Sequence, residues 1–457
     1  MYLAEVKVSG IRGFSGPRGV DLRLTRPDGS HAGWTVLAGR NGSGKTTLLR
    51  AMALAMAGPS VARSLIPAFD GWVSDDQLEG AVEAKVVFDK NRDVFVGGGR
   101  RPKSMFPARL TWTRQLLDES GQYGPRPSLR GYEGTAARGP WGDNPQGWFF
   151  TGYGPFRRLV GGSADAQRLM LSAGPVARLA SLFHEDASLA ESVSWLIDLH
   201  LRRLEGRPGA ERMLSFVTDL LNDGLLPDSF SVVRVDSEGL WAERDGRLIA
   251  LREMSDGYRT VTALVLDLVR QMGQVYSAEL AGSLAGREAF VPGLLEEKGS
   301  PTIHMPGVVL IDEIDVHLHV SWQKRIGEWL KAHFPAIQFI VTSHSPYICQ
   351  SADPGGLIRL PGVDEDLPPR VVEEDLYERI VYGSGDDALL TDLFGIDSPY
   401  SERAEELRRR LTVLERAVLR GRATPEELKE YDRLRERLSS TLTARVDEVA
   451  ARIADAP

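Results

Sequence analysis

A glycine-rich octapeptide near the start of the chain constrains the fold more than any other feature. Residues 39–46 read Gly-Arg-Asn-Gly-Ser-Gly-Lys-Thr and fit the pattern G-x-x-x-x-G-K-[ST] in full. The apolar segment Trp34–Ala38 precedes them, and residues 45–56 follow a helical pattern. Strand, glycine-rich loop and helix are the order that a phosphate-binding loop (P-loop) requires. We therefore expect an α/β protein whose central element is a P-loop.

The residues of this loop have separate expected roles. Backbone N–H groups of the glycine-rich turn cradle phosphates, and the following helix adds its positive N-terminal end. Lys45 should reach the β- and γ-phosphates, and Thr46 should bind Mg²⁺. The expected cofactors are therefore ATP and Mg²⁺. The expected nucleotide-binding set is Gly39, Arg40, Asn41, Gly42, Ser43, Gly44, Lys45, Thr46 and Thr47.

An acidic pair later in the chain complements the loop. Residues 308–311 are Val-Val-Leu-Ile, and Asp312 and Glu313 follow directly. An apolar run of this kind is typical of a buried parallel strand. Asp312 is expected to be the second Mg²⁺ ligand, and Glu313 to orient and activate the attacking water. The P-loop favours this interpretation over an ordinary core strand that ends in a solvated acidic pair.

Two shorter motifs accompany these. His344 follows the apolar segment 339–342 and is expected to contact the γ-phosphate and sense its loss; the alternative is a satisfied loop histidine. Ser255, Asp256 and Gly257 precede a long predicted helix, whose N-terminus is a candidate anion site; the alternative is simple helix capping. The candidate catalytic residues are Glu313, His344 and Lys45.

Taken together, the motifs resemble the ABC-type ATPase heads of the SMC, RecF and OLD group. They occur in the order P-loop, Ser-Asp-Gly signature, acidic pair and histidine, and the resemblance covers residues 1–60 and 230–350. It implies an ATPase that dimerises around ATP. In such a dimer Ser255, Asp256 and Gly257 act on the nucleotide of a second copy, and Asp315 lies in the loop that communicates across the dimer.

The sequence departs from the family pattern in two places. The family has a glutamine between the P-loop and the signature, but the best candidate segment, 148–158, has none, so the residue that replaces it stays open. Many relatives read Leu-His-Pro after the acidic pair, where this chain has Leu318-His319-Val320. His317 and His319 belong to this family loop, and no further ligand follows at a suitable spacing, so we expect no transition-metal site there.

Within the group, the chain resembles the stand-alone ATPases of bacterial anti-phage systems: PtuA of Septu systems, retron-associated ATPases and AriA. It has no long heptad insertion between its two ATPase halves and no TOPRIM-like acidic arrangement after His344. The resemblance implies control of a separate effector, often a nuclease. The alternative is a RecF-like DNA-repair ATPase, indicated by the cluster of Arg100, Arg101, Lys103 and Arg109 and by the aromatic–basic segment 153–158. A third is an ATP-stabilised scaffold that barely hydrolyses.

Spacing and composition predict four segments. We expect the N-terminal ATPase half with the P-loop in residues 1–160 and an inserted helical lobe in 161–228. The C-terminal ATPase half with signature, acidic pair and His loop should occupy 229–395, and a helical hairpin 396–457.

Bulk properties narrow the class of protein. The net charge of -8 argues against a polycation that coats nucleic acid, although a local basic groove remains possible. A basic start with an apolar core is missing, and the longest apolar helical stretch, 261–272, contains two charges and is too short for a bilayer. One cysteine indicates a reducing compartment. We expect a cytoplasmic protein without membrane contact.

Overall fold

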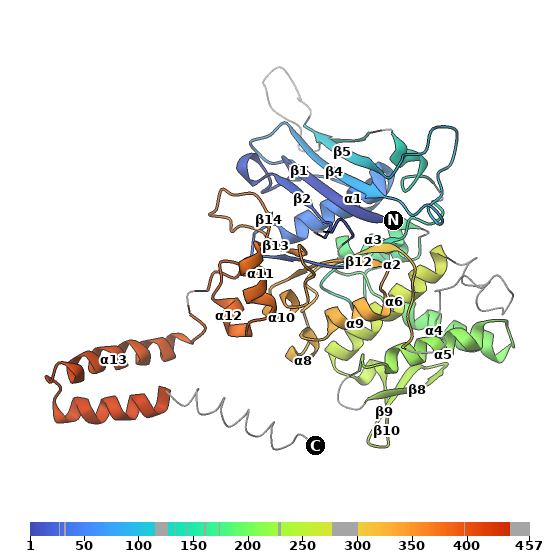
Figure 1. Ribbon diagram of the computed structural model, residues 1–457. Coiled ribbons are helices and arrows are strands. Elements are labelled where there is room, and N and C mark those ends of the chain that lie inside the picture. Colours follow the sequence, from blue (N-terminus) through green and yellow to red (C-terminus); the bar gives the residue numbers. More distant parts are fainter. Residues whose placement is uncertain are drawn as a thin grey trace. The chain divides into compact units, whose positions relative to one another are not determined.

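The computed structural model describes residues 1–438, apart from 27, 32, 115–126, 133, 144, 160, 173, 227–229, 277–299 and 397. The chain divides into two compact units, Met1–Ala388 and Leu389–Pro457. Figure 1 shows the elements of both units along the sequence. The first unit contains all predicted site residues, and its mixed sheets and helices confirm the expected α/β class.

A six-stranded sheet forms the centre of the first unit, in the order β14-β13-β3-β12-β11-β7. The neighbours from β13 to β7 pair in parallel, and only β14 is antiparallel to its neighbour. Every residue of β3, β7, β11 and β12 is buried, as is usual for parallel strands covered on both faces. The strands are β3 (Trp34–Ala38), β7 (Phe150–Tyr153), β11 (Gly307–Ile311), β12 (Ile337–Ser343), β13 (Leu357–Arg359) and β14 (Arg370–Val371).

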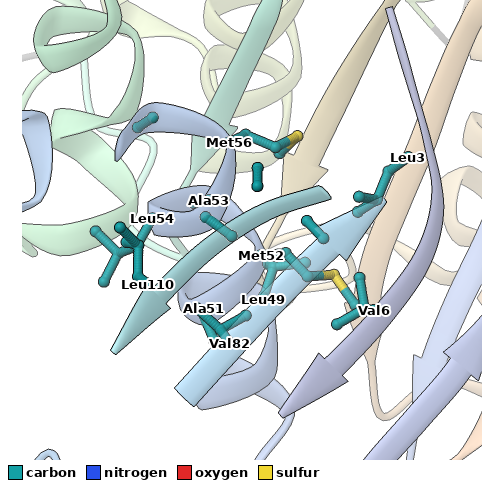
Figure 2. Packing of buried hydrophobic residues seen from close by; sticks show 14 of the residues in the cluster. Leu3, Val6, Leu49, Ala51, Met52, Ala53, Leu54, Met56, Val82 and Leu110 are labelled. Atoms are coloured by element: carbon teal, nitrogen blue, oxygen red, sulfur yellow. The ribbon is translucent and has the colours of Figure 1, made fainter. Parts of the chain in front are cut away.

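A five-stranded antiparallel sheet, in the order β2-β1-β4-β5-β6, covers the helix that follows the P-loop. Burial alternates along its strands, so one face is apolar and packs on that helix. Figure 2 shows Leu49 and Met52 of the helix beside Val6 and Val82 of the sheet. The strands are β1 (Tyr2–Ser9), β2 (Val20–Arg23), β4 (Glu79–Val87), β5 (Met105–Thr113) and β6 (Ser128–Gly131).

The helix after the P-loop, α1 (Lys45–Leu65), runs through the largest hydrophobic core. The sequence pattern predicts a helix over residues 45–56, and the backbone at Gly58 is indeed not helical, with φ of 85° and ψ of 175°; a second helical segment follows directly and completes α1. Pro59 follows and has no N–H to donate to the carbonyl of Ala55. The indole Nε1 of Trp141 donates to that carbonyl instead, at 2.9 Å.

The expected helical lobe and the segment after it lie between β7 and β11 in the chain. Four helices are followed by a three-stranded antiparallel sheet and by the long helix that begins at the signature. Helix α3 packs against α1 and β7, and α4 packs against α6. The elements are α2 (Ala164–Met170), α3 (Pro175–Phe183), α4 (Ala190–Leu204), α5 (Ala210–Asn222), β8 (Ser231–Asp236), β9 (Gly239–Arg244), β10 (Arg247–Ala250) and α6 (Asp256–Val275).

Short helices lie between and after the remaining strands. The sequence of residues 321–333 predicts one helix, but a turn at residues 324 and 325 divides this segment into two helices. These and the later helices are α8 (Val320–Gln323), α9 (Ile326–His333), α10 (Pro346–Cys349), α11 (Glu374–Val381) and α12 (Gly385–Leu389). The 3-10 turns are η1 (Gly16–Arg18), η2 (Thr135–Arg138) and η3 (Leu251–Glu253). Within the described residues, no helix is both long and apolar enough to cross a membrane.

The second unit contains a helical hairpin formed by α13 (Glu402–Leu419) and a helix over residues 425–438. The second helix starts with a capping box: Thr424 N donates to Glu427, and Glu427 N donates to the Thr424 hydroxyl. Arg410 and Glu430 pair across the hairpin at 2.7 Å. Residues 397 and 439–457 of the predicted hairpin segment lie outside the described residues.

Candidate nucleotide-binding site

The P-loop backbone requires glycine at specific positions. Gly42 and Gly44 have φ values of 78° and 95°, a region that side-chain-bearing residues rarely adopt. A Cβ on Gly44 would lie 2.6 Å from the ring of Phe14, and one on Gly39 would lie 2.5 Å from the carbonyl oxygen of Leu360. The loop is therefore packed between two other segments, and α1 begins directly after Gly44.

Lys45 lies folded back on this loop. Its Nζ donates to the carbonyl of Gly39 at 2.9 Å and to that of Arg40 at 3.0 Å. Burial lowers the pKa of Lys45 to about 8, while the negative charges of Asp312 and Glu313 oppose that shift. The ammonium group thus lies close to the acidic pair, in the place from which a phosphate would draw its hydrogen bonds.

Three oxygen-bearing side chains meet at the carboxyl ends of β11 and β12. The hydroxyl of Thr46 donates to Asp312 Oδ1 at 3.1 Å, and the hydroxyl of Thr342 donates to the same oxygen at 2.6 Å. The backbone N–H of Glu313 in turn donates to the Thr342 hydroxyl at 2.7 Å. The two predicted Mg²⁺ ligands are adjacent, although 266 positions separate them in the sequence. Thr342 was not predicted; its place at the end of the strand before His344 is its only signal.

The acidic turn after β11 has an unusual backbone. Glu313 has φ of 46° and His317 has φ of 67°, both in the left-handed region. Burial, together with the charges of Asp312 and Asp315, raises the pKa of Glu313. The carboxylate of Asp315 accepts a hydrogen bond from the Ser343 hydroxyl at 2.6 Å. Non-glycine residues persist in this region only where their surroundings hold them, which is common at functional sites.

The sequence indicates Arg157 only as part of the aromatic–basic segment 153–158, considered for DNA binding, and not as a residue of the ATPase site. Arg157 follows β7 within segment 148–158, where the family glutamine was expected, and it is 2% exposed. Among the described residues its guanidinium donates only to backbone carbonyls: Nη1 to Gly154 and Asp312, both at 3.0 Å, and Nη2 to Glu313 at 3.2 Å and Ile314 at 3.3 Å. Burial lowers the pKa of Arg157 to about 10, against the charges of the nearby acids.

His344 follows β12 directly and is half-buried. Burial lowers its pKa, and the positive charge of Lys45 lowers it further. The imidazole is therefore expected to be neutral at pH 7, able to donate one hydrogen bond and accept another. Its role as a γ-phosphate sensor stays a prediction.

Arg12 is a further basic group beside the P-loop. It lies over the ring of Trp72, 5.1 Å from its centroid, and its Nη1 is 3.5 Å from the hydroxyl of Thr47. Burial lowers the pKa of this guanidinium. The position of Arg12 places a positive charge at the start of α1. No motif in the sequence indicated this residue.

The signature residues begin α6. Ser255 is the N-cap by position, but its hydroxyl makes no capping hydrogen bond, contrary to the simple capping interpretation. Asp256 forms an ion pair with Arg259, one turn later. A Cβ on Gly257 would lie 2.6 Å from the carbonyl oxygen of His317, so glycine is needed where this turn meets the acidic loop.

A pocket of about 390 Å³ opens beside the signature. Its lining combines the signature with the loop after the acidic pair, and residues 39–47, all of them described, contribute nothing to it. The lining residues are Ser255, Asp256, Gly257, Tyr258, His317, His319, Ser321 and Trp322. His319 accepts a hydrogen bond from Ser321 N and so caps α8.

The basic residues that suggested DNA binding differ in their position and in their contacts. Arg100, Arg101 and Lys103 are exposed on the loop before β5. Arg109 on β5 lies 3.8 Å from the carboxylate of Glu79 on β4. The loop itself is held by Arg138, whose guanidinium donates to the carbonyls of residues 98 and 100.

Two family descriptions match the chain. Residues 198–350 match the family described as "AAA domain, putative AbiEii toxin, Type IV TA system", and residues 5–125 match an "AAA domain" family. The first range holds the signature, the acidic pair and His344, and the second holds the P-loop.

Several curated proteins are similar in sequence. Septu protein PtuA of Bacillus mycoides (strain KBAB4) is 24% identical over 339 residues, 74% of this chain and 37% of PtuA. The Retron Ec83 probable ATPase of Escherichia coli is 33% identical over 25% of this chain and 17% of its own length. The Retron Vc95 probable ATPase of Vibrio cholerae is 31% identical over 30% of this chain and 22% of its own. The chain thus spans well under half the length of these relatives.

Among solved structures, an SMC head bound to the C-terminal winged-helix domain of ScpA is similar with a TM-score of 0.42 and 16% identity, over 81% of this chain and 97% of that one.

The sequence relatives confirm the predicted resemblance to the ATPase group that includes PtuA and the retron-associated ATPases. Both matching families are ATPase-domain families.

Proposed function

Because this chain is related to the Septu and retron ATPases, we propose that it binds and hydrolyses ATP with Mg²⁺ and closes as a dimer around the nucleotide. We further propose that the dimer controls a separate nuclease effector in cytoplasmic anti-phage defence. The observation that carries the ATPase proposal is the contact between Thr46 and Asp312. Two motifs that are 266 positions apart in the sequence meet there as a pair of oxygen ligands, which is the arrangement that binding of a metal nucleotide requires.

The residues present fit Mg²⁺. The Thr46 hydroxyl and the Asp312 carboxylate are hard oxygen ligands, which Mg²⁺ prefers, and two ligands leave room for water and phosphate oxygens. Thr342 orients the Asp312 carboxylate by donating to it. When bound, the ion would neutralise the negative charge of the β- and γ-phosphates.

The protein groups around this position have complementary tasks. Lys45 exchanges the carbonyls of Gly39 and Arg40 for phosphate oxygens as ATP enters. Glu313 accepts a hydrogen bond from the attacking water and orients it, and its raised pKa improves it as a proton acceptor. The neutral His344 donates to the γ-phosphate.

The dimer proposal is supported by the separation of the signature from the P-loop. The pocket beside Ser255, Asp256 and Gly257 draws nothing from the P-loop of the same chain. The start of the 20-residue helix α6 points its N–H groups towards it. We propose that the γ-phosphate held by a second copy enters this pocket, and that Asp315 communicates across the interface.

Substitutions of Lys45 and Glu313 test the ATPase proposal. Lys45→Ala should abolish binding of a fluorescent ATP analogue, because the loop loses its phosphate-binding ammonium. Glu313→Gln should bind ATP, hydrolyse it at least about a hundred-fold more slowly, and accumulate as a dimer in light scattering. Normal ATP binding by Lys45→Ala would overturn the site assignment.

The effector proposal needs a separate experiment. The tagged protein would be purified with its neighbouring genes co-expressed and ATP present, and its native mass measured. A stable complex with a second, nuclease-like chain is the expected result. A bare ATP-dependent dimer that is retained on duplex DNA at low salt would contradict it and favour the DNA-repair alternative.

A further inference from the structure

The conformation of the acidic turn poses a physical problem. Glu313 has to present its side chain to the nucleotide from a left-handed backbone that an L-residue adopts only under constraint. Thr342 holds one side of the turn, through the N–H of Glu313 and the carboxylate of Asp312. The N–H of Ile314 donates to the backbone carbonyl of the same Thr342 at 3.1 Å. Strand β12 therefore fixes two N–H groups of the turn. Among the carbonyls of the turn, that of Glu313 accepts the N–H of Val316 at 3.1 Å, and a further partner reaches three successive carbonyls.

Arg157 is that partner. Three successive carbonyls, those of Asp312, Glu313 and Ile314, converge on its two terminal nitrogens. None of its hydrogen bonds to described residues involves a carboxylate, although Asp312, Glu313 and Asp315 are close enough to raise the pKa of Arg157 through their charges. A buried guanidinium normally pairs with an acid. Here the guanidinium donates to backbone oxygens instead, so it does not pair with the acidic side chains.

The segment that carries Arg157 is itself anchored. The carbonyl of Tyr153 accepts the N–H of Asp312 at 2.8 Å, so β7 and the acidic turn are in register. The Tyr153 hydroxyl donates to Asp267 on α6 at 3.0 Å, and Arg270 pairs with the same carboxylate. The guanidinium is thus placed by a strand that also contacts the helix of the signature.

We propose that Arg157 is the positioning residue of the acidic turn and occupies the structural place of the missing family glutamine, acting on Glu313 through the backbone. The proposal rests on the proposed ATPase function. The guanidinium keeps the turn in the conformation in which Asp312 faces Thr46 and Glu313 is free to orient water. A side chain that only filled space would not need four carbonyl acceptors.

Two substitutions of Arg157 test this inference. Arg157→Met removes all donors. Arg157→Lys keeps the charge but has a single nitrogen, which reaches only part of the carbonyl set. We expect kcat for ATP hydrolysis to fall about a hundred-fold in Arg157→Met, because small misplacements of a catalytic group have effects of that size, and less in Arg157→Lys. KM for ATP and binding of a fluorescent ATP analogue should stay unchanged, because the P-loop is not altered.

Arg178 supplies a matched control. It is also deeply buried, at 4% exposed, and burial lowers its pKa to about 10 as well. Its guanidinium lies over the rings of Phe149 and Phe150 and, among the described residues, forms no hydrogen bond or ion pair with the acidic turn. Arg178→Met therefore removes a buried arginine from the same part of the fold. It should change thermal stability while kcat of the folded protein stays at the wild-type value.

The outcomes separate the possible failures. Wild-type kcat in both Arg157 variants, or a joint loss of kcat and ATP affinity, would overturn the positioning role. If Arg157→Met does not fold, Arg157→Lys decides on its own by the same split between kcat and KM. Absence of ATP hydrolysis by the wild-type protein would contradict the proposed function itself and not this inference.

Discussion

Asp353 illustrates how one buried carboxylate joins separate pieces of the first unit. Its Oδ2 accepts hydrogen bonds from Arg26 at 2.6 Å and from the backbone N–H groups of Gly33 and Trp34 at 2.7 and 3.1 Å. Its Oδ1 accepts from Lys331 on α9 at 3.2 Å. Burial alone would raise the pKa of Asp353, but the Arg26 hydrogen bond and the Lys331 charge outweigh it, and the pKa lies below its ordinary value.

We predict that Asp353→Asn destabilises the protein at neutral pH by about 1–3 kcal/mol, because charged hydrogen bonds to Arg26 and Lys331 are lost. A lowered pKa in the folded state contributes stability above the ordinary pKa of the unfolded chain. That contribution is lost as the pH falls through the folded-state pKa. The difference in unfolding free energy between wild type and variant should therefore shrink below about pH 4. Urea titrations at several pH values measure this, and a difference independent of pH would contradict it.

At the residue scale, the sequence could predict those candidate site residues that belong to a local motif. Lys45 and Thr46 belong to one octapeptide, and Asp312 and Glu313 follow one apolar strand. Arg157 could not be predicted in this way, since three of its four acceptors are backbone carbonyls more than 150 positions away and backbone atoms leave no sequence pattern. Ser255 shows that a local motif can also predict a contact that the structure lacks. Serine is typical of an N-cap, but the Ser255 hydroxyl makes no capping hydrogen bond, because residue type alone does not fix a rotamer.

At the element scale, α1 shows how a distant side chain satisfies a carbonyl that a local break leaves without a backbone donor. The backbone at Gly58 is not helical and Pro59 has no N–H to donate, so two helical segments meet there. The ring of Trp141 packs where a Cβ on Gly58 would lie, 2.5 Å from its nearest atom, and its Nε1 satisfies the Ala55 carbonyl. A residue 86 positions later thus replaces the missing backbone donor.

Trp141→Phe tests this account. The substitution keeps an aromatic ring but removes the donor, so the Ala55 carbonyl at the kink loses its partner, and we expect a loss of about 1–3 kcal/mol in unfolding free energy. Chemical denaturation measures the loss. A variant as stable as the wild type would mean that this hydrogen bond does not stabilise the break in α1.

The antiparallel sheet shows why some elements escape prediction. Strand β1 is evident from its alternation, but β4 reads Glu-Gly-Ala-Val-Glu-Ala-Lys-Val-Val. Glycine, alanine, glutamate and lysine have weak strand propensity, and the burial of every second residue becomes visible only in the folded sheet. Tertiary packing on α1, not local preference, selects the strand.

At the scale of the whole molecule, the proposed dimer makes a prediction about the signature. Ser255→Arg should place a long cation in the pocket beside α6 and block closure on ATP. Binding of ATP to a single copy should be unaffected, since the P-loop does not line that pocket. Light scattering with the Glu313→Gln background, with and without Mg-ATP, measures closure.

The control for this prediction is Ser237→Arg, the same substitution in the exposed turn between β8 and β9. In the Glu313→Gln background, the Ser237→Arg protein should form the ATP-dependent dimer as the Glu313→Gln protein does. A Ser255→Arg protein that still forms the ATP-dependent dimer would contradict the assignment of the signature to a partner's nucleotide, while leaving the P-loop assignment in place.

The central sheet has a consequence for how this protein is made. Strand β3 lies between β12 and β13, whose residues follow it in the chain only from position 337 onward. On the ribosome the apolar segment Trp34–Ala38 leaves the exit tunnel long before either neighbour is synthesised, and unpaired apolar strands are prone to aggregate until they are paired. A chain released early would carry Lys45 and Thr46 without the acidic pair. We therefore expect such premature fragments to lack the proposed ATP turnover, which requires both halves of the sheet.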